Sequence, residues 1–167
     1  MSIELLDGQT TIANPLDVIE SVASALEAEG DRVEDAELHL SLRGMWRDTG
    51  LWLTWRPEIA TLQLGAPLDI RAGSGRRLAV AELITLINER LWVGHFEMWS
   101  DDLSIIYRNG LVLPESGALD ASQAKRLVSG ATEAIDRFFP AFNYVIWGGK
   151  DADEAMEASL FETAGTA

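Results

Sequence analysis

The spacing of apolar residues changes within the segment 76–99, near the middle of the chain. Up to Leu91 they recur at steps of three and four residues, which predicts a helix with one apolar stripe. The stripe consists of Val80, Leu83, Ile84, Ile87 and Leu91. Over 93–99 apolar and polar residues alternate, with Phe96 on one face and His95 and Glu97 on the other, which predicts a strand. Almost no linker separates the two elements, so we expect a rigid corner on which the rest of the chain packs.

The same helix carries a second apolar flank. Leu78 and Leu86 lie off the main stripe, where a single sheet would not cover them, and Trp92 follows closely. We therefore predict that Leu78, Leu86 and Trp92 form the contact of a homodimer.

The remaining elements follow from local patterns. Asn14 and Pro15 open a helix that ends near Gly30, and an acidic turn is expected over 31–35. Alternation predicts strands over 37–43, 51–56, 61–66 and 104–113. A capping box at Asp120 opens a long helix that Pro140 is expected to interrupt, and a last short helix covers about 151–162. For 142–147 a helical turn and an extended segment both remain open.

These elements predict an α+β fold of two layers, an antiparallel sheet and the helices that pack on it. The expected order of elements is α-β-β-β-α-β-β-α plus a C-terminal helix. Short polar turns between successive strands favour antiparallel pairing, because parallel neighbours need a long crossover. We expect one domain over 1–167, with flexible ends at about 1–12 and 163–167.

Charge narrows the classes of partner. Of a net charge of −14, residues 1–37 contribute −9 and residues 151–167 contribute −5, so the middle of the chain is neutral. Nucleic acid and anionic membrane both require clustered Lys and Arg, and neither is expected to bind. The chain has no cysteine, no apolar run long enough for a membrane span and no signal-peptide pattern, so we expect a cytoplasmic protein.

Candidate chemistry is sparse. His95 and Glu97 share a strand face but lack a visible third ligand, and His39 lies on another strand. The run 73–77 could hold a phosphate at a helix start, but it lacks the third glycine of a dinucleotide site, and 148–150 lacks the upstream glycine of a P-loop. We therefore expect no catalytic residues, no cofactor and no metal.

Tryptophan on the second predicted strand has no obvious place in a core. Alternation puts Trp52, Thr54 and Arg56 on one face and the larger apolar set of Leu51, Leu53 and Trp55 on the other. If helices cover one face, Trp52 is left for a partner. We predict that Trp46, Trp52 and Arg56 contact a partner protein.

Several runs of the sequence resemble the YbjN family of bacteria, in the version found in alphaproteobacteria. They are Ala81–Leu83, Ile87–Ser100 with its N-E-R-L-W-x-G-H-F run, Leu51–Arg56, Phe139–Phe142 and Ile146–Lys150 with its I-W-G-G-K run. The resemblance covers nearly the whole chain and implies a fold similar to that of type III secretion chaperones, which dimerise through the corresponding helix and neighbouring strands. Members carry the description "putative sensory transduction regulator", which names no catalytic residue. At Asn109-Gly110 the sequence departs from the family's more usual His-Ala, so no histidine role transfers there.

Pattern and resemblance together favour a non-enzymatic module that holds an extended or amphipathic segment of a partner polypeptide. The alternative is a regulator that senses a small ligand bound between helices and sheet. An enzyme that uses His95 and Glu97 is the third hypothesis.

Overall fold

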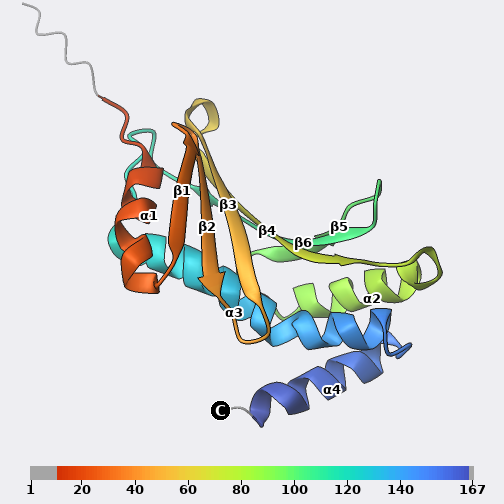
Figure 1. Ribbon diagram of the computed structural model, residues 1–167. Helices are drawn as coiled ribbons and strands as arrows, with labels where there is room; N and C mark the ends of the chain where they lie inside the picture. Colours follow the sequence, from red (N-terminus) through yellow and green to blue (C-terminus); the bar gives the residue numbers. More distant parts are fainter. Residues whose placement is uncertain (1–10, 166–167) are drawn as a thin grey trace, which may run out of the picture.

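The computed structural model describes residues 11–165 (Figure 1). Within this range the helices are α1 (Pro15–Ala23), α2 (Arg77–Asn88), α3 (Ala121–Ile146) and α4 (Ala152–Ala164), and the strands are β1 (Glu29–Glu34), β2 (Glu37–Arg43), β3 (Asp48–Arg56), β4 (Thr61–Arg71), β5 (His95–Met98) and β6 (Ser104–Val112). Of the ends predicted to be flexible, residues 1–10 and 166–167 lie outside the described part. Across 11–165, no helix combines the length and the apolar character that crossing a bilayer requires.

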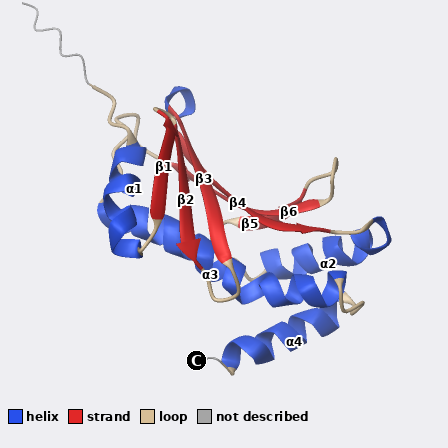
Figure 2. Cartoon of the chain, in the orientation of Figure 1, coloured by secondary structure: helices blue, strands red, loops and turns tan. Residues whose placement is uncertain are grey.

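All strand pairs in the described chain are antiparallel, and they form one sheet in the order β1-β2-β3-β4-β6-β5. The sheet bends, so that β1–β3 stand across the direction of β5 and β6, and the helices gather on one side of it (Figures 1 and 2). Buried residues alternate along β2 and β3, which is the pattern of a sheet covered on one face. The predicted α+β fold class is confirmed.

β1 is a strand that the sequence patterns did not predict, because an acidic turn was expected in its place. Its pairing with β2 uses main-chain groups, and its side chains are mostly exposed, so it shows no apolar alternation. Arg32 instead faces α1, where its guanidinium pairs with Asp17 at 3.0 Å and Glu20 at 3.2 Å. The α-helix ends at Ala23, well before Gly30, and so leaves room for this strand.

α3 continues through Pro140 to Ile146, so the predicted interruption is wrong and most of 142–147 is helical. Proline has no N–H to donate to the carbonyl four residues earlier, which here belongs to Asp136. The indole N–H of Trp46, in the β2–β3 turn, donates to that carbonyl at 2.8 Å. The main-chain N–H of Met45 also donates to the Asp136 carboxylate at 2.9 Å. A turn about 90 residues away in sequence therefore supplies the hydrogen bond that Pro140 removes.

The predicted helix and strand on either side of this corner are present, but α2 ends at Asn88 and β5 begins at His95, so the near absence of a linker was wrong: residues 89–94 connect the two elements. Side chains fix this connection. Asn88, the last residue of α2, accepts from the Phe96 N–H at 2.9 Å and donates to the Phe96 carbonyl at 3.0 Å, much as a neighbouring strand would. Gly94 has φ +72°, and a Cβ there would lie 2.1 Å from the hydroxyl of Tyr107. Phe96 is buried against Tyr107, with ring centroids 5.3 Å apart, so the corner is anchored in the core.

Candidate functional site

The sheet face opposite the helices, which we call the open face, is not covered by any described element. On β3, Leu51, Leu53 and Trp55 are buried beneath the helices, whereas Trp52 and Thr54 are half-buried on the open face. The predicted division of this strand between two faces is therefore confirmed. The strand register aligns one row of residues across the open face: Asp31, His39, Trp52, Gly65, Arg108 and His95.

Trp52 lies beside Gly65, its partner on the neighbouring strand β4. A Cβ at Gly65 would lie 2.0 Å from the indole ring, so the ring rests directly on the main chain of β4. A larger residue at position 65 would push the ring away. The absence of a side chain at Gly65 is thus required for the observed position of the Trp52 ring.

Trp52 forms one wall of a cleft of about 460 Å³ in which Trp99 also lies, and we call it the Trp52–Trp99 cleft. Pro67 and the buried Ile106 also line it. The cleft lies where the pairing of β4 with β6 shifts register between Pro67 and Arg71. Such irregularities in a sheet redirect side chains and often occur at functional sites.

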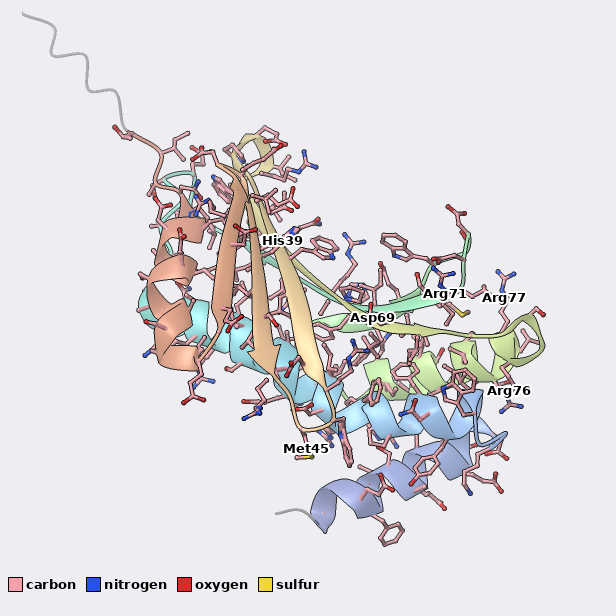
Figure 3. The ribbon with its side chains drawn as sticks, viewed as in Figure 1. His39, Met45, Asp69, Arg71, Arg76 and Arg77 are labelled. Carbon is pink, nitrogen blue, oxygen red and sulfur yellow. The ribbon has the colours of Figure 1, made fainter. Side chains whose placement is uncertain are left out.

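Charged groups of β4 and of the β5–β6 turn line part of this cleft. The carboxylate of Asp102 pairs with the Arg71 guanidinium at 3.2 Å, and Asp69 pairs with Arg47 from the β2–β3 turn. Figure 3 shows Asp69 and Arg71 on the bent part of β4, and His39 farther along the sheet on β2. The rim is therefore polar around an aromatic centre.

A second polar group continues from the cleft along β5 and β6. Glu97 accepts from the Trp99 indole N–H at 2.8 Å and from Arg108 at 3.3 Å, and His95 lies 3.5 Å away. Burial raises the pKa of Glu97, but the hydrogen bond from Trp99 and the charge of Arg108 outweigh it and hold this pKa below its usual value. Glu97 is therefore ionised at neutral pH and holds Trp99 in position.

These residues do not assemble a metal site. His39 pairs with Glu37 at 2.7 Å, and four strand spacings, about 19 Å, separate β2 from β5, which carries His95. In the part of the chain that the structure describes, no three His, Cys, Asp or Glu side chains are grouped so as to hold a metal ion.

Of the three residues predicted to contact a partner, Trp52 alone lines the cleft. Arg56 lies on the same face but at the end of β3, where its nearest acid, Glu58, is 3.8 Å away. Trp46 is 42% exposed, but it lies on the helix side, bound to α3. Trp99 was missed, although its spacing of two from Glu97 and four from His95 placed it on the same strand face.

The other large hollow is a groove of about 530 Å³ between α3 and β6, which we call the α3–β6 groove. It is lined mainly by apolar side chains, among them Leu91, Tyr107, Leu111, Leu127 and Phe138. It exists because Gly130 and Ala134 present almost no side chain on this face of α3, and because β5 begins only opposite Arg108, so the end of β6 extends past it.

Trp92 lies at this groove and is fully exposed, at 100%. Leu78 is also exposed, at 80%, whereas Leu86 is half-buried against the core. The three residues predicted to form a dimer contact are thus partly available on the surface of the single chain, and the dimer remains a prediction.

The glycine-rich run before α2 has a structural role. The Arg76 guanidinium donates to the carbonyl of Val145 at 2.8 Å and to that of Lys150, so it caps the end of α3. Figure 3 places Arg76 and Arg77 at the start of α2. Because Arg76 is bound to carbonyls, the arrangement does not support a phosphate cradle at 73–77.

Fold and site together define an α+β protein whose antiparallel sheet has one face that no described element covers. The model of the YbjN family, described as "Putative bacterial sensory transduction regulator", matches residues 15–143, and the chain belongs to this family. A similar solved structure is titled "Crystal structure of YbjN, a putative transcription regulator from E. coli". It is 18% identical, with a TM-score of 0.51, over 72% of this chain and 85% of that chain, which shows a shared fold. No curated protein sequence matches the chain.

Proposed function

We propose that this protein is a non-enzymatic regulator that binds an extended segment of a partner polypeptide on the open face of its sheet. The observation that carries the proposal is the Trp52–Trp99 cleft, an apolar hollow between two tryptophans on a sheet face that no described element covers. Tryptophans of this kind, held in position and half-exposed, dominate the binding energy of many protein interfaces.

The geometry favours a polypeptide over a reacting substrate. The ring of Trp52 lies in the space that Gly65 leaves, and Trp99 donates a hydrogen bond to Glu97, so both rings have their positions in the single chain without a partner. Because the cleft is preformed, binding a side chain there orders few further groups of the protein, which lowers the entropic cost of binding. Arg71 on the polar rim pairs with Asp102, and Arg108 farther along β6 pairs with Glu97; either guanidinium can also donate to main-chain carbonyls or acidic side chains of the same segment.

The test is selection of displayed random peptides on the purified protein, followed by measurement of the selected peptides by fluorescence polarisation. Trp52→Ala should weaken binding by more than about tenfold, as at other interface anchors. It should cost only about 1–2 kcal/mol of stability, because the ring is half-buried on Gly65. Trp147→Ala is the matched control, since Trp147 is 76% exposed at the end of α3, away from the cleft.

Selected peptides that bind Trp52→Ala as tightly as the unchanged protein would contradict the proposal, because the cleft would then not be their site. Failure to select any peptide that depends on the cleft would count against it in the same way.

The alternative, a regulator that senses a small ligand, is favoured by a different observation. The α3–β6 groove lies between a helix and the sheet, and its volume of about 530 Å³ falls within the range of small-molecule sites. The groove and the Trp52–Trp99 cleft have different linings, so one can be changed without the other.

A further inference from the structure

The α3–β6 groove is apolar along its length and polar at its rim. Its floor includes the buried residues Tyr107, Leu127 and Phe138. The floor is already packed, but Gly130 leaves space above it, because a Cβ at that position would meet nothing within 4 Å. An apolar chain could therefore lie along α3 without moving the core.

Two arginines of α3 line this groove. Neither Arg126 nor Arg137 has a carboxylate within 4 Å among the ion pairs of the described residues, although the protein has 27 acidic residues and 13 Lys or Arg. Arg137 instead lies over the ring of Phe138, 5.1 Å from its centroid, which orients its guanidinium at the apolar surface. Glu133 is the one acid in the lining, and the amide groups of Asn109 and Gln123 add further hydrogen-bonding capacity.

From this arrangement we infer that the α3–β6 groove binds a small amphipathic anion, with an alkyl chain along Gly130 and a carboxylate or similar head group on one of the two arginines. The positions of Arg126 and Arg137 are about 16 Å apart along the helix, so a single head group contacts one of them. The inference concerns a second site and does not depend on peptide binding at the Trp52–Trp99 cleft.

Decanoate is the probe, titrated by isothermal calorimetry below its critical micelle concentration. Decanol and decyltrimethylammonium carry the same chain with a neutral and a cationic head group. We expect saturable binding of one decanoate per chain. Its affinity should be at least about tenfold higher than that of decanol or decyltrimethylammonium, because neither of these can accept a charge-assisted hydrogen bond from arginine through an anionic head group.

Gly130→Leu is the blocking variant. Its side chain points into open space, and leucine is a better helix former than glycine, so the variant should fold with an equal or higher melting temperature and lose decanoate binding. Ala121→Leu is the matched control, an added leucine at the exposed first residue of α3, and it should bind decanoate normally.

Arg126→Gln and Arg137→Gln, made separately, locate the head group. One of them should weaken decanoate binding about tenfold or more, while the other changes it less than about threefold. Equal binding of all three amphiphiles, unchanged binding in Gly130→Leu, or no effect of either arginine variant would each overturn the inference. It would also be overturned if the unchanged protein were a dimer by light scattering and Gly130→Leu a monomer, because a second copy would then fill the groove.

Discussion

The carbonyl of Asp136 allows a quantitative test of how α3 tolerates a proline. Pro140 cannot donate to it, and the indole N–H of Trp46 does so at 2.8 Å. We predict that Trp46→Phe, which keeps an aromatic ring but removes the donor, destabilises the protein, and that the loss is smaller when Pro140 is replaced by alanine. Alanine supplies a main-chain N–H at the position where the helix needs one.

The coupling energy between positions 46 and 140 depends on how exposed the hydrogen bond from Trp46 to the Asp136 carbonyl is. A hydrogen bond of this kind contributes about 0.5–1.5 kcal/mol net, and more when its loss leaves a fully buried carbonyl. Trp46 is 42% exposed, so water can partly replace it, and the expected value is about 1 kcal/mol. The Pro140→Ala change alone combines a better helix former with the loss of a buried ring, so the informative quantity is the difference between the two backgrounds.

The assay is urea unfolding followed by far-UV circular dichroism, because Trp46 itself contributes to fluorescence. All four proteins of the cycle are compared at one concentration, with the slope of free energy against urea checked for constancy. Trp147→Phe in the same two backgrounds is the control and should show coupling below about 0.5 kcal/mol. If Trp46→Phe costs the same with proline as with alanine at 140, the indole does not replace the missing helical bond.

Three further results are expected. Asn88→Ala removes both hydrogen bonds to the main chain of the buried Phe96 and should cost about 2–3 kcal/mol in the same assay, whereas Asn143→Ala, in the last turn of α3, should stay within about 0.5 kcal/mol. The pKa of Glu97 is lowered in the folded protein, so its stabilising contribution is present above its unfolded value of 4.5 and is lost as pH falls below that; Glu97→Gln should flatten this part of the stability curve measured by urea unfolding. Light scattering at micromolar concentration should give twice the chain mass of 18.3 kDa, and Trp92→Ser should lower it, while a single-chain mass at every concentration would contradict the dimer.

Strands with alternating apolar residues could be predicted from the sequence, because burying one face of a sheet requires an apolar side chain at every second position. β1 could not be predicted in this way. It is held by main-chain pairing with β2 and by the ion pairs of Arg32 with α1, and neither leaves a local apolar pattern. Edge strands with polar side chains are therefore missed by any reading based on hydrophobic period.

The site was partly readable for the same reason. Alternation alone placed Trp52 on the open face, and it could have placed Trp99 there as well. The cleft between them could not be predicted, because it depends on the register shift between Pro67 and Arg71 and on the missing side chain at Gly65. Both depend on which residues pair between neighbouring strands, and the sequence of one strand alone does not determine that pairing.

Two exposed tryptophans of this chain, Trp46 and Trp92, differ in whether contacts within the fold explain their positions. Trp46 is partly exposed, yet its indole N–H satisfies a carbonyl in α3, so its position is explained by the fold. Trp92 is fully exposed in a segment whose neighbours Asn88 and Gly94 both fix the α2–β5 corner. Trp92 therefore exposes apolar area to solvent and adds nothing to the packing of this constrained segment. Because Trp92 also lies at the α3–β6 groove, we expect it to contact a second molecule, and the light-scattering comparison with Trp92→Ser tests this expectation.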